Sequence, residues 1–156
     1  MIRRLFACGI LFVAAACGGD IAGPAGADGL TLEVAVSSPN IEFGEVDTIT
    51  ATLTNKTSSR IDLTFPSSCQ IVPYVTNLVG TIVAPPGGSR PCLTVIGSRT
   101  LEPHEVQKTR FLWLGAADFT GSTRGGRLPG GVYRVYVTLE AYDVQLTSRR
   151  VTVHLK

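Results

Sequence analysis

Apolar and polar residues alternate with a period of two along most of the chain after residue 29, which predicts β-strands with one buried face. The alternation is clear in residues 30–36, 48–54, 61–65, 106–114 and 133–139. Segments rich in Pro, Gly, Asn and Ser separate these runs and predict turns. After the first 16 residues, no stretch of ten residues has the 3.6-residue period of an amphipathic helix. The pattern therefore predicts an all-β domain.

Two sets of side chains are predicted to supply the largest part of the core. Tyr133, Val135, Val137 and Leu139 form the clearest inward row, because polar residues occupy the positions between them. The only tryptophan, Trp113, shares its strand face with other large or β-branched residues, where a sandwich core needs its largest side chain.

Two segments depart from simple alternation. Pro73 interrupts the apolar pattern of residues 69–83, which predicts edge strands because proline cannot donate to a central ladder. In the last segment the apolar positions change parity between Leu146 and Val151. A continuous strand therefore needs a bulge around residues 147–150.

About seven to eight strands at this spacing favour an antiparallel, immunoglobulin-like β-sandwich with Greek-key connections. The stretch LPGGVYRV, residues 128–135, is typical of the tyrosine corner that opens a late strand of such sandwiches, with Tyr133 bonded to upstream backbone. An antibody-type domain would have a cysteine at the position of Val135. The domain is therefore not of the antibody type.

The first 16 residues, MIRRLFACGILFVAAA, have the three parts of an export signal. Arg3 and Arg4 precede an apolar run from Leu5 to Val13, and small alanines follow it. The run is too short to cross a bilayer as a helix, which needs about 20 apolar residues. A cysteine, Cys17, comes directly after the alanines.

This arrangement resembles a bacterial lipoprotein signal, in which the cysteine thiol is acylated, the chain is cut before it and the new amino terminus is acylated. Ala14 stands where the lipobox of that family usually has leucine. The resemblance implies that Cys17 carries lipid and attaches the protein to a membrane. The alternative is a plain secreted protein in which Cys17 is incidental.

These features divide the chain into a signal peptide (1–16), a lipidated cysteine with a flexible tether (17–29) and the β-sandwich domain (30–156). The tether is mostly Gly, Ala, Pro and Asp, a composition that cannot bury a core. Its random-coil span is about 20 Å, enough to lift a domain off a membrane surface.

The cysteine count fits an oxidising compartment. Cys8 leaves with the signal and Cys17 carries lipid, so Cys69 and Cys92 remain and are expected to form a disulfide. The alternative is a metal site, but two sulfurs without nearby histidines would leave a zinc shell incomplete. We therefore expect no metal and no cofactor.

Charge and motifs exclude several function classes. Loss of Arg3 and Arg4 with the signal lowers the basic residues from 14 to 12, which equals the 12 acidic residues, and no charge run indicates nucleic-acid binding. His104 lies in a proline turn and His154 alternates with apolar residues, so neither indicates a general base. No GxSxG, HExxH or phosphate loop is present. The domain is not expected to be an enzyme.

Several segments in order resemble one family. They include TLTNKTSSRIDLTF (52–65), VGTIV (79–83), LEPHE (101–105), FLWLG (111–115) and LPGGVYRVYVTLEA (128–141). Over residues 46–141 the chain is similar to the BsuPI-type intracellular proteinase inhibitor domain, an immunoglobulin-like β-sandwich that also occurs attached to bacterial lipoprotein signals. The resemblance implies the sandwich fold and raises protease inhibition as a hypothesis. His104 replaces the glycine common in the LxPGE turn, and the cysteine pair is not a feature of the intracellular inhibitor.

Two functions follow from these observations. The first is a lipid-anchored lipoprotein of the bacterial cell envelope, outside the cytoplasm, whose non-catalytic sandwich binds an envelope protein or glycan. The alternative is a proteinase inhibitor, for which the proline-rich loop 84–92 offers Ser89, Arg90 and Pro91 as the binding residues, because a stiff loop loses less entropy on binding. Gly18 after the cysteine is not the aspartate that retains lipoproteins in some inner membranes, so sorting to an outer membrane stays open.

Overall fold

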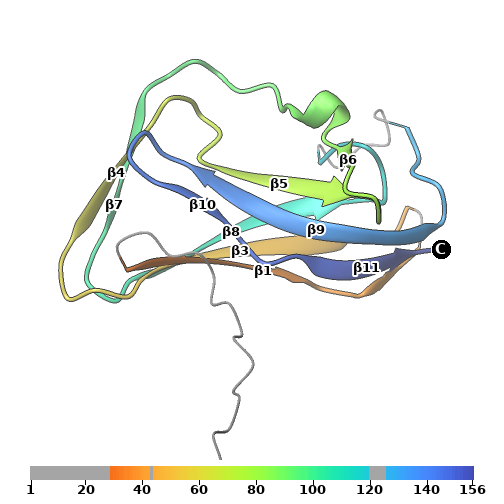
Figure 1. The fold of residues 1–156 in the computed structure, drawn as a ribbon, viewed down its shortest axis with the longest axis horizontal. Coiled ribbons are helices and arrows are strands. Elements are labelled where there is room, and N and C mark those ends of the chain that lie inside the picture. Colours follow the sequence, from red (N-terminus) through yellow and green to blue (C-terminus); the bar gives the residue numbers. More distant parts are fainter. Residues whose placement is uncertain (1–28, 43, 120–125) are drawn as a thin grey trace, which may run out of the picture.

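The computed structural model describes residues 29–42, 44–119 and 126–156 (Figure 1). The signal peptide, Cys17 and the tether up to residue 28 lie outside this described part. The described residues form eleven strands and one 3-10 turn, namely β1 (Leu30–Val36), β2 (Asn40–Ile41), β3 (Asp47–Asn55), β4 (Ile61–Phe65), β5 (Ile71–Thr76), β6 (Ile82–Ala84), η1 (Pro86–Gly88), β7 (Gly97–Leu101), β8 (Val106–Trp113), β9 (Gly131–Glu140), β10 (Gln145–Thr147) and β11 (Val151–Leu155).

The strands form two main sheets and one ribbon. One sheet has the order β1-β3-β8, and the other has the order β2-β11-β9-β5-β6 with β10 also paired to β9. β4 and β7 form a two-stranded ribbon at one end of the molecule (Figure 1). The chain leaves the first sheet after β3, forms β5 and β6 in the second, and returns at β8. All of these pairs are antiparallel except that of β2 with β11. The predicted antiparallel, immunoglobulin-like β-sandwich is confirmed.

The core consists of the inward rows of both sheets, as the alternation predicts. Burial alternates residue by residue along β3 and β9. Trp113 at the end of β8 has no exposed surface, and its indole Nε1 donates a 2.7 Å hydrogen bond to the carbonyl oxygen of Ala116. The buried hydrophobic cluster of the described residues runs from Leu30 to Leu155. The chain after the tether therefore contains a complete core.

The predicted irregularity before the last strand is confirmed as a bulge. Thr147 of β10 pairs with Thr138 and Val151 of β11 pairs with Val135, so four steps from β10 to β11 face three along β9. The hydroxyl of Ser148, which is buried, accepts a 3.0 Å hydrogen bond from the backbone N–H of Val137 in this gap. The bulge restores the inward parity of β11, and the Ser148 side chain replaces the missing ladder partner.

The edge prediction for residues 69–83 is wrong for β5, which lies between β9 and β6. β6 pairs only with Val75 and Thr76, so Pro73 lies where β5 has a single neighbour, β9. A proline without a donor is tolerated there because its other side carries no ladder. The tyrosine corner forms as predicted, since Tyr133 Oη donates a 2.6 Å hydrogen bond to the carbonyl oxygen of Pro129.

Candidate functional site

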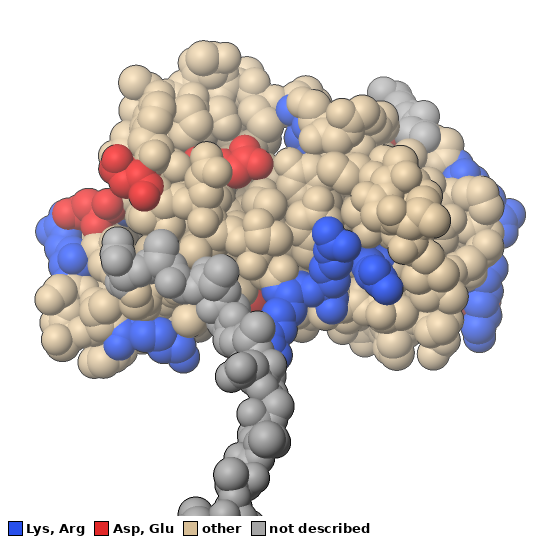
Figure 2. All heavy atoms as spheres, viewed as in Figure 1, with Lys and Arg blue, Asp and Glu red and all other residues tan. Residues whose placement is uncertain are grey.

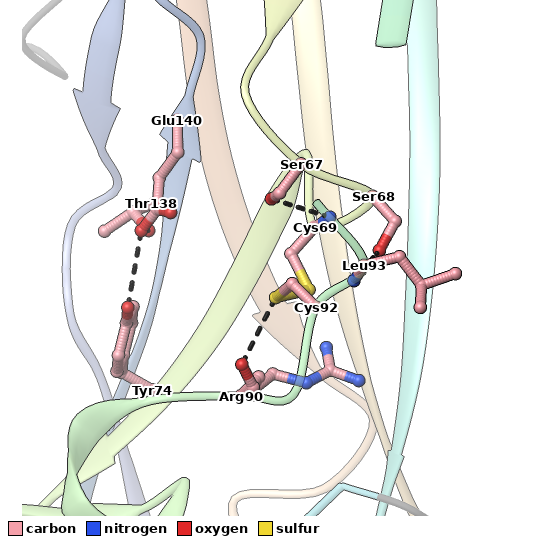
Figure 3. The surroundings of a disulfide bond; sticks show 9 residues. All are labelled: Ser67, Ser68, Cys69, Tyr74, Arg90, Cys92, Leu93, Thr138 and Glu140. Carbon is pink, nitrogen blue, oxygen red and sulfur yellow. Dashed lines mark hydrogen bonds between the residues drawn. A yellow bond between two sulfur atoms is a disulfide. The ribbon is translucent and has the colours of Figure 1, made fainter. Parts of the chain in front are cut away.

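The disulfide joins two segments that would otherwise be independent loops. Cys69 precedes β5 and Cys92 follows η1, and the two residues form a disulfide with a Cα–Cα distance of 5.6 Å (Figure 3). Ser68 adds two hydrogen bonds to Leu93: its N–H donates to the Leu93 carbonyl at 3.0 Å and its Oγ accepts from the Leu93 N–H at 2.9 Å. The predicted pairing is confirmed, and residues 84–96 are tied to the start of β5. We call residues 89–96 the stapled segment.

Removal of the disulfide tests how much this bond contributes to the stability of the domain. Replacement of both Cys69 and Cys92 by alanine is expected to lower the free energy of unfolding by about 3 kcal/mol, because the loop closed between them no longer restricts the unfolded chain. Urea unfolding of the two proteins measures the difference. Dithiothreitol should reduce the stability of the wild type to that of the double variant and leave the variant unchanged. A wild type that is insensitive to the reductant would contradict the prediction.

The three loop residues predicted as a binding site do not point the same way. Ser89 and Pro91 are exposed, whereas Arg90 is half-buried. The Arg90 guanidinium carbon lies 5.6 Å from the centroid of the Phe111 ring on β8. Figure 3 shows the Arg90 side chain extending away from the disulfide toward that strand. Burial lowers the pKa of Arg90, and no carboxylate contributes to the shift. Arg90 thus belongs to the wall of a pocket and not to the tip of a loop.

The pocket has a volume of about 340 Å³ and lies between the stapled segment, the start of β5, β7 and β8. Arg90 and Pro91 come from the stapled segment, Arg99 from β7, and Thr109 and Phe111 from β8. Its lining residues contain two arginines and no aspartate or glutamate. We call this space the arginine pocket.

The stapled segment, which supplies Arg90 and Pro91 to the pocket, also carries exposed apolar side chains. Leu93, Val95 and Ile96 expose 71%, 58% and 72% of their surface, and they lie between Pro91 and Arg99 along the chain. None of the three belongs to a strand. Three large apolar residues so close together are more than the scattered exposure normal for a soluble surface, and such groups mark interaction sites.

A second polar cluster lies on the outer face of the β9 sheet. The rings of Tyr74 and Tyr136 stack with centroids 5.2 Å apart, and the Arg150 guanidinium lies 5.3 Å from the centroid of the Tyr136 ring. Glu140 Oε1 accepts hydrogen bonds from Tyr74 Oη at 3.4 Å and from Thr138 Oγ1 at 3.2 Å. Burial, followed by the charge of Glu140, raises the pKa of Tyr74. The ring contacts and hydrogen bonds link these groups to one another across neighbouring strands, so we interpret the cluster as stabilising the sheet.

The candidate metal-ligating residues in the described part of the chain do not gather at one place. No group of three or more His, Cys, Asp or Glu residues there could hold a metal ion. His104 is exposed in the turn between β7 and β8, where its φ of 61° is left-handed. A left-handed φ is a conformation that glycine adopts more readily than histidine. No helix of the described residues is long and apolar enough to span a membrane.

Charged side chains are dispersed over the visible face of the molecule. Figure 2 shows Lys and Arg in several small groups separated by uncharged surface, with Asp and Glu gathered toward the end that carries β4 and β7. This face therefore presents no continuous basic band of the kind that follows a nucleic-acid backbone.

Sequence reasoning found Arg90 and the cysteines but missed Arg99 and Phe111 as their neighbours. Arg99 lies on β7, which follows the stapled segment directly, and Phe111 lies on β8, further along the chain. Alternation along the sequence does not show that either side chain faces Arg90. The apolar stretch at 92–96 was visible in the sequence. Its exposure was not, because its alternation is too short to assign a face.

Comparisons with known proteins show no family for this chain. No family model matches the chain, and no curated protein matches it. Among solved structures, it is similar to a β-glucosidase from Erythrobacter marinus (12% identity, TM-score 0.47, covering 81% of this chain and 15% of that chain). An alkylpurine DNA glycosylase from Pseudomonas fluorescens bound to DNA with an abasic site analogue gives 13% identity, a TM-score of 0.48, and coverage of 82% of this chain and 30% of that chain. A CARDB domain from Pyrococcus furiosus in complex with di-metal ions gives 15% identity, a TM-score of 0.47, and coverage of 81% and 87%. At these identities and TM-scores the likenesses say nothing about activity.

Proposed function

We propose that the chain is a lipoprotein of the bacterial cell envelope, anchored through an acylated Cys17, whose β-sandwich is a non-catalytic binding domain. The observation that carries the proposal is the disulfide between Cys69 and Cys92 in a chain that begins with an export signal. Disulfides persist in oxidising compartments and are rare in the cytosol. The pairing of these two thiols fits the export of the chain and leaves Cys17 for another use.

The position of the first strand also supports a tethered domain. Leu30, the first residue of β1, is already 99% buried, since only 1% of its surface is exposed. The compact domain thus begins directly after the predicted tether, whose composition of Gly, Ala, Pro and Asp suits a flexible spacer. Mass spectrometry of the native amino terminus tests the proposal. A chain that starts at an acylated Cys17 supports it, and a chain that starts at Met1 refutes it.

Non-catalytic binding fits the described surface better than catalysis or protease inhibition does. The arginine pocket is preformed, and the segment that supplies Arg90 to it also carries exposed apolar residues, as expected for an interaction site. No paired carboxylates or nucleophile with an adjacent base lies in that pocket. Recovery of a specific partner from envelope extracts by the purified domain would support this part of the proposal.

Protease inhibition at Ser89, Arg90 and Pro91 is the second hypothesis, and it follows from the resemblance to the BsuPI-type domain. The staple favours it, because a restrained loop loses less entropy when a protease binds. The position of Arg90 speaks against it, because an inhibitory arginine must project into a protease pocket and this one lies over Phe111.

Assays with trypsin-like and subtilisin-like proteases separate the two hypotheses. We expect no inhibition by the intact domain at micromolar concentration, and no difference between the wild type and Arg90→Ala. Inhibition that disappears in Arg90→Ala would establish the inhibitor hypothesis and displace the one preferred above.

A further inference from the structure

The arginine pocket carries positive charge, as an anion-binding site does, and none of its lining residues neutralises that charge. Arg90 and Arg99 both line the pocket, one from the stapled segment and one from β7, and no acidic residue lines it. Outside this lining, hydrogen bonds with Gln107 and the Glu102 backbone lower the pKa of Glu105, and the charge of Arg99 lowers it further. Burial alone shifts the pKa of Arg90, downward, as expected of a cation that loses water without gaining a carboxylate. An incoming anion would form favourable charge-assisted hydrogen bonds with a half-buried guanidinium of this kind. Folding has already removed part of the water around the guanidinium, so binding has less water left to displace.

The contrast with Arg60 shows what a satisfied arginine looks like in this protein. The Arg60 guanidinium donates to Asp62 Oδ1 from Nη2 at 2.9 Å and from Nε at 3.1 Å, and the pair is well exposed. Arg90 has instead the ring of Phe111 as its neighbour, with the guanidinium carbon 5.6 Å from the ring centroid, a contact that uses none of the N–H donors in the plane of the guanidinium.

The surroundings select the kind of anion. The volume of about 340 Å³ is at the lower end for ligand pockets and suits one short acidic side chain or a small ion. Leu93, Val95 and Ile96, exposed on the segment that supplies Arg90 to the pocket, would remain uncovered by an inorganic ion. A peptide segment that carries a carboxylate among apolar side chains complements both surfaces at once.

We propose that the arginine pocket binds a carboxylate side chain of a protein partner, held by Arg90 and Arg99, while apolar residues of the same partner segment cover Leu93, Val95 and Ile96. This inference rests on the proposed function of the domain as a binding module. It adds the chemistry of the ligand and the residues that recognise it.

NMR titration tests the inference with the chain from residue 18 to 156, which contains the complete core and the disulfide. The probes are a library of end-capped hexapeptides with one glutamate among apolar residues, the same library with glutamine in its place, and inorganic phosphate. The signals followed are the Nε–H groups of Arg90 and Arg99 and the methyl groups of Leu93, Val95 and Ile96. The glutamate library is expected to shift both sets and to bind at least about tenfold more tightly than the glutamine library.

Two variants assign the binding to the pocket. Arg90→Gln is expected to weaken binding of the glutamate library about tenfold or more. Arg110→Gln is the matched control, because Arg110 is exposed on β8 and its position in the alternation places it on the face opposite Phe111. Unchanged circular dichroism and melting temperature of both variants show that the fold is intact. The control should bind as the wild type does.

Three results would overturn the inference: equal binding of the two libraries, binding that Arg90→Gln leaves unchanged, or shifts of the arginine signals by phosphate alone, which would indicate a free-anion site. Failure here is distinguishable from failure of the proposed function. A partner recovered from envelope extracts equally by wild type and Arg90→Gln would keep the binding module and reject only this pocket. A native chain that starts at Met1 would reject the envelope assignment whatever the peptides do.

Discussion

Replacement of Trp113 by alanine is expected to lower the free energy of unfolding by about 3–5 kcal/mol, which is a large share of the stability of a domain of this size. Trp113 is fully buried at the end of β8, against the core that β9 and β3 supply. Its loss leaves the largest cavity that any single truncation in this core can create. It also leaves the carbonyl oxygen of Ala116 without the indole donor that it has in the native domain.

Urea unfolding followed by far-ultraviolet circular dichroism measures this loss, because the variant has no tryptophan fluorescence. The adjacent residue provides the control. Leu112 exposes 51% of its surface on the opposite face of the same strand, so Leu112→Ala should change the free energy of unfolding by no more than about 0.5 kcal/mol. A Trp113→Ala protein that is as stable as Leu112→Ala would show that the indole is not the centre of the core.

The long strands of this sandwich could be predicted because each has one face in the core and one in water. The inward row of β9 and the parity change before β11 are direct readings of that alternation, and both are confirmed. The short strands β2, β6 and β10 have two or three residues each, too few for a period of two to be recognised. They exist because longer neighbours offer free ladder positions, and a single sequence does not record those positions.

In the candidate site, too, some features can be predicted from the sequence and others arise only from packing. The disulfide followed from cysteine arithmetic and the compartment, without knowledge of the strand order. The arginine pocket did not, since it forms only where β7, β8 and the start of β5 meet the segment that carries Arg90. Arg90 was expected to project from a loop. The ring of Phe111 offers it a favourable contact that draws the guanidinium back onto the domain.

Replacement of Cys17 by alanine is expected to abolish incorporation of labelled palmitate into the protein and to remove the mature domain from the membrane fraction. Each buried CH₂ of an acyl chain contributes about 0.8 kcal/mol, so several chains on one residue hold a protein to a bilayer for far longer than a single chain does. We therefore expect Cys17→Ala to lose labelling and membrane association completely, whereas substitutions in the domain are expected to produce graded effects.

Metabolic labelling, cell fractionation and the intact mass of the processed chain measure the effect together. Cys8→Ala is the matched control, because Cys8 lies in the apolar run of the predicted signal and leaves with it. It should leave both labelling and fractionation unchanged. Cys69 and Cys92 are joined in the disulfide, so neither supplies a free thiol for acylation in the folded domain. Label that persists in Cys17→Ala, or label that is absent from the wild type, would therefore contradict lipidation at Cys17, and no other cysteine of the mature chain could account for it.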